Sequence, residues 1–423
     1  MTIIQRRPWG QNYAFVVAGV IFLALLAAAG VRAAPGVLIL PLGQAFGWSR
    51  DSISLAAAVG IFLYGLVGPF AAALMQAVGI RRTLIAALSL MAVSIAASHW
   101  MTQPWHLLLS WGVFSGLGSG CVAIVLGATV VNRWFVRHRG LMLGLLTAST
   151  ATGTLAFLPA LAAIAEHGGW RPVVWTVSAV CAVLVPLVWW LLPERPADAG
   201  LLPYGADPAL ARTDAPRRNL LGIALGTLAR ASRHGTFWCL VGTFFICGFT
   251  TNGLIGTHFI AMCGDHGIPE VRAAGLLAMM GFCDLIGTTL SGWLTDRFDS
   301  RKLLFMYYGL RGASLIWLPY SDFSFSSLSI FGVFYGLDWI ATVPPTLKIA
   351  AETFGDNDAP VVFGWVAAGH QMGAATAAFF AGSMRTYTGN YFESLVIAGC
   401  LGIVASFLAI AIRRRPTLSP QPA

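Results

Sequence analysis

The sequence predicts an all-α membrane protein of twelve transmembrane helices arranged as two pseudo-symmetric six-helix bundles. Of its 423 residues, 57% are hydrophobic and only 10% are charged, and the mean hydropathy is +0.74. One water-soluble globule of this length cannot bury so much apolar surface. Apolar segments of about 20 residues, the length that crosses a bilayer, recur along the chain. One long polar stretch near the middle divides them into two sets.

The period of the apolar residues excludes a membrane β-barrel. Barrel strands alternate apolar and polar residues over about ten positions. The stretches 89–97 and 173–192 are instead apolar on every face. We therefore expect helices, which satisfy their backbone hydrogen bonds within one segment.

Hydropathy places the twelve helices in order along the chain. They fall near 13–40, 53–78, 83–101, 105–131, 140–165, 172–192, 237–262, 273–295, 303–320, 326–350, 360–384 and 393–412. The proline-rich segment 193–236 holds most of the longest polar stretch, which is typical of a linker. The predicted organisation is an N-terminal six-helix bundle over 1–192, a cytoplasmic linker over 193–236, and a C-terminal six-helix bundle with a short tail over 237–423.

The distribution of basic residues predicts the orientation in the membrane. Most of the 26 Lys and Arg residues lie in the termini, the linker and every second loop. The opposite loops hold only Arg50, Arg171, Arg272 and Arg385. By the positive-inside rule, both termini and the linker are predicted to be cytoplasmic, with the protein in a plasma (bacterial inner) membrane.

Composition and motifs also limit the classes of binding partner and cofactor that the chain is expected to have. The net charge of +9 does not indicate nucleic-acid binding, because the basic residues are scattered among short loops. The seven cysteines lie in apolar segments without a C-x-x-C pair, and no H-E-x-x-H motif occurs, so we expect no metal and no cofactor. No nucleophile–base arrangement indicates an enzyme. The expected partner is the lipid bilayer; the oligomeric state stays open, and a monomer is compatible with the sequence.

The loop after the eighth predicted helix carries a cluster of charges. It reads Gly292-Trp-Leu-Thr-Asp296-Arg297-Phe-Asp-Ser-Arg301-Lys302. Acidic and basic side chains at adjacent helix ends can pair across two bundles and then separate, so we predict a cytoplasmic gate formed by Gly292, Asp296, Arg297 and Arg301. A purely topological charge cluster is the alternative. In the equivalent loop of the first half, Gln76 replaces the expected acid, so that half cannot pair in the same way.

This loop resembles the G-x-x-x-D-R-x-x-R-R signature of the major facilitator superfamily. The stretches 35–50 and 132–140 resemble the monocarboxylate porter family, including its oxalate–formate antiporter-like branch. The resemblance implies a secondary active transporter in which two halves rock about a central site. It further implies small organic anions, monocarboxylates above all, as substrates and protons as the coupled ion.

Charged side chains inside the membrane are the first candidates for the site, because each costs at least ~2.5 kcal/mol at mid-helix. Four are predicted there: Arg32, Asp284, Arg311 and Asp338. Arg32 lies about where the resembled carriers place a basic residue that receives the substrate carboxylate. Its planar guanidinium can donate two hydrogen bonds to one carboxylate and keeps its charge. Snorkelling to the interface, or pairing with a neighbouring helix, is the alternative.

Asp284, in the eighth helix, is predicted to be the proton-coupling residue. Desolvation and a nearby cation act on such a carboxyl in opposite directions, so that it can take up and release a proton. In monocarboxylate carriers an Arg follows the matching Asp by four residues, whereas this chain has Thr288. The partner charge must then come from Arg32 or Arg311. If neither reaches Asp284, the fold prediction holds and the substrate is open.

Arg311, in the ninth helix, is predicted to be the charge partner of Asp284 or Asp338. Asp338 precedes Pro344 and Pro345 in the tenth helix, and these prolines bend a helix and free backbone carbonyls. Two interpretations of Asp338 stay open. It is either a proton-coupling or substrate-binding residue, or the ion-pair partner of Arg311.

Four further polar residues are predicted to bind substrate: Asn252 and His258 in the seventh helix, Tyr335 in the tenth and His370 in the eleventh. The seventh and eleventh helices face the cavity in the resembled fold. A neutral imidazole can donate to a carboxylate or relay a proton. The alternative for each histidine is a hydrogen-bonded packing residue.

Two other functions stay open at this point. Efflux of amphipathic metabolites or drugs is the first, although the proline-containing antiporter signature of drug exporters is not evident in the fifth helix. A membrane sensor that binds ligand without moving it is the second. The short tail after Arg415, which carries no signalling domain, argues against the sensor.

Overall fold

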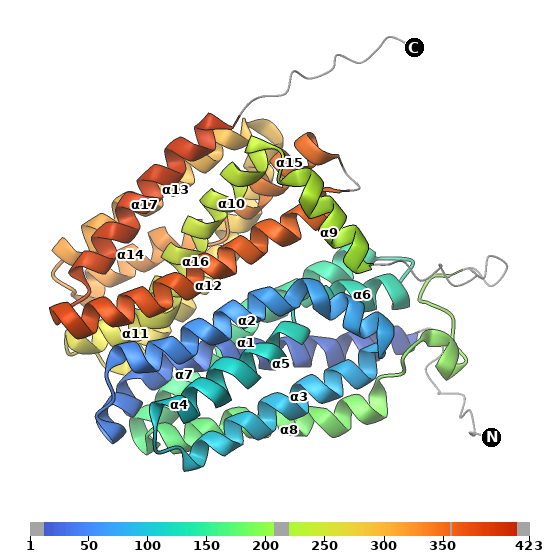
Figure 1. Cartoon of the computed structure of the whole chain (residues 1–423), viewed down its shortest axis with the longest axis horizontal. Helices are drawn as coiled ribbons and strands as arrows, with labels where there is room; N and C mark the ends of the chain where they lie inside the picture. Colours follow the sequence, from blue (N-terminus) through green and yellow to red (C-terminus); the bar gives the residue numbers. More distant parts are fainter. Residues whose placement is uncertain (1–11, 207–219, 356–357, 413–423) are drawn as a thin grey trace, which may run out of the picture.

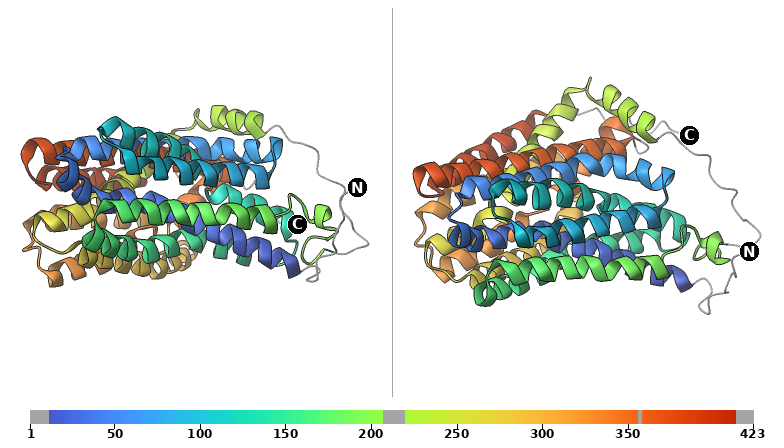
Figure 2. Two further views of the ribbon diagram at one scale, coloured as in Figure 1. Left: turned by 90° about the horizontal axis from the view of Figure 1, so that it is seen from below. Right: turned by 60° about the horizontal axis from the view of Figure 1, so that its bottom comes forward.

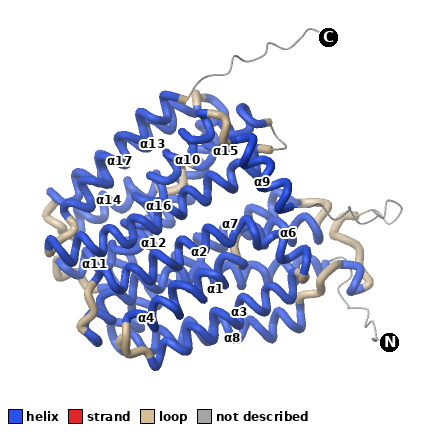
Figure 3. Tube along the Cα trace, viewed as in Figure 1, coloured by secondary structure: helices blue, strands red, loops and turns tan. Residues whose placement is uncertain are grey.

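The computed structural model describes residues 12–206, 220–355 and 358–412. Within these residues the chain is helical apart from turns and loops, and no strand is present (Figure 3). The one isolated β-bridge described joins Phe135 and Tyr204. This agrees with the expectation that each segment satisfies its backbone hydrogen bonds internally.

The first half of the chain forms six membrane-length segments. The unbroken ones are α1 (Tyr13–Phe46), α2 (Arg50–Ala77), α3 (Ile80–Ala97), α7 (Arg139–Gly168) and α8 (Trp170–Leu191). The fourth segment is built from α4 (Pro104–Leu107), the π-helix η3 (Leu108–Phe114), α5 (Ser115–Cys121) and α6 (Ile124–Trp134). Short 3-10 turns, η2 (Ser98–Trp100) and η4 (Pro196–Ala199), follow α3 and α8.

The second half repeats this arrangement after a short helix α9 (Leu220–Ala231) in the predicted linker. Its first segment joins α10 (Gly235–Gly248), the π-helix η6 (Phe249–Ile255) and α11 (Gly256–Asp265). There follow α12 (Glu270–Arg297), α13 (Ser300–Trp317) with the turn η7 (Leu318–Tyr320), the broken pair α14 (Phe325–Asp338) and α15 (Val343–Phe354), α16 (Ala359–Thr388) and α17 (Phe392–Ala411).

These segments confirm the predicted fold class. In the described part of the chain, nine helical segments are long and apolar enough to cross a membrane by length and composition alone. The helices α7, α13 and α16 bring the segments to the predicted twelve. The main differences from the sequence boundaries lie in α1, which continues past Pro41 to Phe46, and in the three broken segments.

The two groups, α1–α8 and α10–α17, pack against each other through matching helices. The contacts join α2 to α16, α7 to α12 and α1 to α11. Counted as membrane segments, these pairs are second with eleventh, fifth with eighth and first with seventh. A two-fold exchange of the halves interchanges the first two pairs and preserves the third, so the contacts follow the pseudo-symmetry.

The halves meet unevenly along their length. Figure 1 shows them converging where α11 and α16 approach α1 and α2, and diverging toward the end where α1 begins and α9 lies. The views of Figure 2 show the same arrangement from other sides. We call the diverging end the linker end and the converging end the far end.

The linker end of the first half is braced by the segment after α8. The Glu194 carboxylate accepts hydrogen bonds from the backbone amides of Arg81 and Arg82, at 3.3 and 3.4 Å, in the first turn of α3. A carboxylate is favourable at a helix N-terminus, where four amides lack partners. Glu194 therefore supplies an acid at the loop where Gln76 had indicated that one was missing.

Candidate substrate and coupling site

Among the four predicted membrane charges, Arg32 on α1 has the fewest described polar contacts. Its guanidinium carbon lies 4.5 Å from the centroid of the Tyr64 ring on α2, a cation–π contact. Its Nη1 is buried and has no hydrogen-bond partner among the described residues. An arginine cannot discard its charge, and an unpaired buried donor costs about 1–3 kcal/mol or more when charged. The group is therefore equipped to receive an anion.

Arg32 and Tyr64 lie where the two halves approach closely. A Cβ atom placed on Gly36, one turn after Arg32, would lie 3.1 Å from the Thr257 carbonyl oxygen of α11. A Cβ atom on Gly65, the residue after Tyr64, would collide with the Gln371 side chain of α16. A side chain at residue 65 would require a shift, and one at residue 36 would be tight. The helices that carry Arg32 and Tyr64 therefore meet the second half close to these two residues.

Arg311 on α13 is fully engaged within the second half. Its Nε donates to Asp338 Oδ2 at 2.6 Å, and its side chain is 0% exposed. Its Nη2 donates to the carbonyl oxygens of Asp338 and Trp339, and its Nη1 lies 3.0 Å from Cys247 Sγ. Of the two partners that the sequence left open, the structure places Asp338 against Arg311.

The tenth membrane segment is broken between Asp338 and Val343, and side chains of α12 and α13 satisfy its freed backbone groups. Asp284 Oδ1 accepts from the Ile340 amide at 2.8 Å, and Ser291 Oγ donates to the Ala341 carbonyl. Arg311 serves the last carbonyls of α14. Unsatisfied backbone groups are costly in a membrane, so these side chains stabilise the break. We call this arrangement the helix-break clamp.

Asp284 is held by hydrogen bonds, and the Arg311 charge acts on it without forming an ion pair. Thr288 Oγ1 donates to Asp284 Oδ1 at 2.9 Å, in addition to the Ile340 amide. No ion pair described for the chain joins Asp284 to Arg32 or Arg311. The Thr that replaces the expected Arg is therefore part of the site. The partner charge of Asp284 therefore stays a prediction, and Arg32 is the candidate residue that bears on the substrate.

His258 and Tyr335 do not line a cavity in this conformation, contrary to the expectation from the sequence. His258 is buried, with Nε2 2.7 Å from the Ala378 carbonyl and Nδ1 3.2 Å from the Tyr391 hydroxyl. Tyr335 is buried and donates to the Thr250 carbonyl at 2.7 Å. Both side chains are occupied by packing contacts within the second half, so neither is free for a substrate here.

Asn252 and His370 are half-buried, unlike the buried His258 and Tyr335. Asn252 is half-buried in the π-helix η6, where its carbonyl accepts from Thr257 Oγ1 at 2.9 Å. His370 is half-buried on α16, with its ring centroid 5.7 Å from that of Phe244. Its Nδ1 is buried without a hydrogen-bond partner in the described part of the chain.

The predicted gate residues lie at the end of α12 and the start of α13, and the hydrogen bonds and ion pairs described for them stay within the second half. Arg297 lies 4.0 Å from the Trp293 ring centroid and donates to the Trp293 carbonyl, while Asp296 is exposed. Arg301 pairs with Asp299 at 2.7 Å, and Gly292 has open space beside its Cα. The pairing across the bundles that the sequence suggested is absent from these contacts, as expected where the halves diverge.

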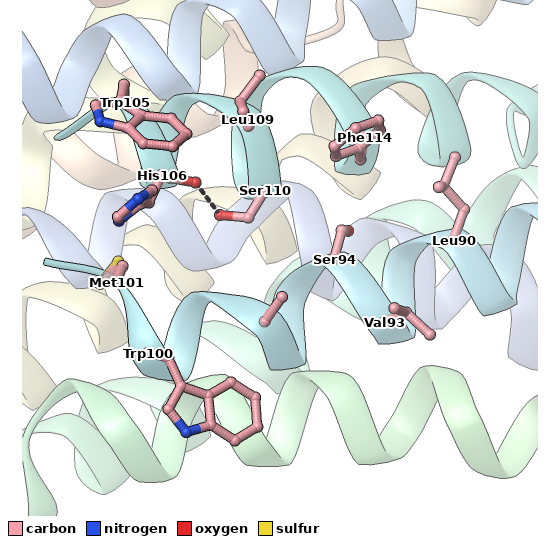
Figure 4. Close-up of a pocket in the computed structure, with 11 residues that line it drawn as sticks. Leu90, Val93, Ser94, Trp100, Met101, Trp105, His106, Leu109, Ser110 and Phe114 are labelled. Carbon is pink, nitrogen blue, oxygen red and sulfur yellow. Dashed lines mark hydrogen bonds between the residues drawn. The ribbon is translucent and has the colours of Figure 1, made fainter. Parts of the chain in front are cut away.

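A surface cavity of about 420 Å³ lies elsewhere, between α3 and the α4–η3 segment. Figure 4 shows its lining, which is mostly apolar, and the Ser110 hydroxyl directed at the His106 carbonyl. Val93, Trp100 and Trp105 on its walls are more than half exposed. No charged group converges on it, so it does not fit an anion site.

Sequence reasoning missed one cluster of charged residues. Arg50, Asp265 and Arg385 come together at the far end in two ion pairs. The first and last had been assigned only to loops, and Asp265 had no assigned role. Their sequence separations carry no signal that these three side chains meet.

Twelve membrane segments in two matched halves are the architecture of a multi-pass membrane transporter rather than an enzyme. Residues 20–342 and 265–423 match the family model of the Major Facilitator Superfamily. The chain belongs to this superfamily.

Curated relatives match along almost the whole chain. The uncharacterized MFS-type transporter YcxA of Bacillus subtilis is 28% identical over 396 residues, covering 91% of this chain and 90% of its own length. Monocarboxylate transporter 13 of Bos taurus is 27% identical over 400 residues, covering 93% and 88%. Monocarboxylate transporter 11 of Homo sapiens is 24% identical over 431 residues, covering 99% and 87%.

Solved structures share the fold. A bacterial homologue of the human lysosomal transporter Spinster, inward-facing and unoccupied, superposes with a TM-score of 0.75 at 17% identity, covering 98% of this chain and 100% of that one. The xylose transporter XylE of E. coli, partially occluded and inward open, gives a TM-score of 0.73 at 16% identity, with coverage of 97% and 100%.

Proposed function

We propose that this transporter moves small organic anions, monocarboxylates above all, by proton-coupled alternating access. The observation that carries the proposal is the guanidinium of half-buried Arg32, on a helix that meets the second half, because its Nη1 has no hydrogen-bond partner among the described residues. The names of relatives as monocarboxylate transporters support the same substrate class. The two moving bodies are residues 1–192 and 237–423, joined by the linker 193–236. The linker end faces the cytoplasm, and the membrane is the plasma membrane.

The chemistry of the site favours one carboxylate per cycle. Arg32 offers a fork of N–H donors that fits a carboxylate, and one anion neutralises it. Tyr64 covers one face of the guanidinium at 4.5 Å, so the ligand approaches its edge. Asn252 and His370, half-buried on the facing half, supply further polar contacts. Binding an anion between helices of the two halves favours the state in which they approach each other.

Asp284 is proposed as the proton-coupling residue through its position in the helix-break clamp. As a carboxylate it accepts strongly from the Ile340 amide at 2.8 Å and from Thr288 at 2.9 Å. A proton on this carboxyl removes the charge from both hydrogen bonds and so weakens the hold on the break between α14 and α15. Asp338 stays the ion-pair partner of Arg311, which keeps the neighbouring charge constant.

The first experiment tests the substrate. Purified protein in liposomes is given a panel of radiolabelled monocarboxylates, with and without an inward proton gradient. We expect gradient-driven uptake by the wild type and its loss in Arg32→Gln. Arg272→Gln removes an exposed arginine of α12 and serves as the matched control, with uptake unchanged. Retained uptake in Arg32→Gln would refute the assignment, and wild-type flux confined to amphipathic compounds would favour the efflux carrier instead.

The second experiment tests the coupling. Asp284→Asn keeps an oxygen acceptor for Ile340 and Thr288 but cannot take up a proton. We expect uptake by this variant to lose its dependence on the pH gradient while exchange of labelled for unlabelled anion survives. An unchanged response to an imposed pH gradient would exclude Asp284 as the proton site.

A further inference from the structure

At the far end, one arginine of the first half forms hydrogen bonds with residues of the second half. Arg50, the first residue of α2, donates through Nη2 to Asp265 Oδ1 of α11 at 2.6 Å. Its Nη1 donates to the Tyr391 hydroxyl at 3.1 Å. Asp265 and Tyr391 both belong to the second half. The two hydrogen bonds therefore tie the halves together at the end where the structure is closed.

The residues that receive Arg50 are held in place by contacts within their own half. Arg385 on α16 pairs with the other oxygen of Asp265, Nε to Oδ2, at 2.7 Å. Because His258 Nε2 faces the Ala378 carbonyl, it must donate there, which leaves Nδ1 to accept from the Tyr391 hydroxyl. The oxygen of Tyr391 is then oriented to accept from Arg50. None of these contacts involves a residue of the first half.

These ion pairs lie at the surface and are partly shielded from water. The side chains of Arg50, Asp265 and Arg385 are 18%, 19% and 26% exposed, although Asp265 as a whole residue is exposed. Partly shielded pairs are screened somewhat less by salt than fully exposed pairs are. Next to them, the Asp51 amide of α2 donates to Thr386 Oγ1 of α16 at 3.2 Å, which closes the same end.

We infer that Arg50, Asp265 and Arg385 form a far-end gate. In this gate Asp265 has two ion-pair partners in the closed state and one in the open state. When the gate is closed, Asp265 holds Arg50 and Arg385. When it opens, Arg50 moves with α2 into water and Asp265 keeps Arg385. No buried charge is left unpaired in either state, so opening breaks only one of the two ion pairs. This inference is independent of the substrate.

The shared aspartate gives the two arginines opposite effects. Loss of Arg50 removes an attraction that exists only in the closed state, so it favours the open state. Loss of Arg385 leaves Asp265 paired when the gate is closed and unpaired when it is open, so it favours the closed state. A merely structural role would make both losses act in the same direction.

Ser54 offers a reporter for opening. It lies one turn after Arg50, is 0% exposed, and packs against Gly382 of α16 behind the gate. Its hydroxyl has no hydrogen-bond partner in the described residues, so a cysteine of similar size fits there. In Ser54→Cys, a membrane-impermeant thiol reagent applied to the far-end face reacts only while the gate is open. Ser49→Cys, exposed at the start of α2, controls for reagent access.

The test compares reaction rates at residue 54 in full-length protein reconstituted in liposomes. We expect Arg50→Gln to raise the rate on the order of tenfold, a usual size for one coupling between two states. We expect Arg385→Gln to lower it and Arg272→Gln to leave it unchanged. Arg50→Lys, which keeps the charge and loses the fork, should raise it less than Arg50→Gln and provides a milder variant should the latter fold poorly. Unchanged rates, or equal increases for Arg50→Gln and Arg385→Gln, would overturn the gate.

Discussion

The charges of the two halves are used differently. In the second half, Arg311, Asp338 and Asp284 are engaged with one another or with the backbone of the broken tenth segment. In the first half, Arg32 contacts an aromatic ring, and its buried Nη1 has no hydrogen-bond partner in the part of the chain that the structure describes. A charge inside the membrane is therefore not evidence of a substrate site by itself. What separates the two cases is whether the charge has an ion-pair partner: Arg311 pairs with Asp338, whose Oδ1 nevertheless lacks a hydrogen-bond partner among the described residues, whereas no ion pair is described for Arg32.

The engaged charges have a structural task that explains their cost. A helix that breaks inside a membrane exposes amides and carbonyls that lipid cannot satisfy. Asp284, Ser291 and Arg311 supply those partners from two neighbouring helices. The break can then persist as a defined bend. Variants of these residues should alter stability, whereas variants of Arg32 should alter transport.

The largest effect is expected for Arg311→Met. This change leaves Asp338 as a buried charge without its partner and removes the donor to two carbonyls. Breaking one side of a buried pair typically costs about 3–5 kcal/mol. We expect a loss of that size in the free energy of unfolding, measured by chemical denaturation in detergent micelles, with Arg272→Gln close to wild type.

The double variant Arg311→Met, Asp338→Leu checks the cause. If the unpaired carboxylate dominates the cost, removing it as well should restore part of the lost stability. The carbonyls of Asp338 and Trp339 would still lack their donor, so recovery should be incomplete. A double variant less stable than Arg311→Met would show that the pair is not the source of the loss.

A smaller effect is expected at Asp284. Leucine there removes the acceptor of the Ile340 amide and of Thr288, and an unsatisfied buried group costs about 1–3 kcal/mol. Asparagine keeps an oxygen acceptor and should cost clearly less. Thermal unfolding followed by tryptophan fluorescence can rank the two variants. Equal losses would mean that the charge, and not the hydrogen bonds, stabilises the helix break.

The fold was largely predictable because its signals are local. Apolar stretches of membrane length, and the prolines at 344 and 345 that begin α15, are each visible in a short window of sequence. The signature from Gly292 to Lys302 indicated the superfamily. The boundaries of α1 and the π-helices were not predictable, because they depend on how neighbouring helices pack.

The site was predictable in its residue types but not in its pairings. Hydropathy identified Arg32, Asp284, Arg311 and Asp338 as membrane charges, yet it could not tell which acid faces Arg311. The partner of Asp284 is the amide of Ile340, which is free only because the helix breaks there. The contact of Arg50 with Asp265 spans 215 residues and depends on how far the halves have closed. Such contacts form only in the folded tertiary structure, in one conformation, so the sequence does not predict them.

The smallest effect on stability, and the sharpest test of the comparison, is expected for Arg32→Gln. Because its guanidinium donates no hydrogen bond that the described structure needs, its loss should change the free energy of unfolding by less than about 0.5 kcal/mol, or slightly stabilise the protein by removing a poorly compensated charge. The cation–π contact with Tyr64 offsets part of that gain, since such contacts are worth about 0.5–1 kcal/mol or more when desolvated. Chemical denaturation of Arg32→Gln and Arg311→Met under the same conditions tests this prediction. A loss comparable to that of Arg311→Met would make Arg32 a structural charge as well, and the contrast between the halves would disappear.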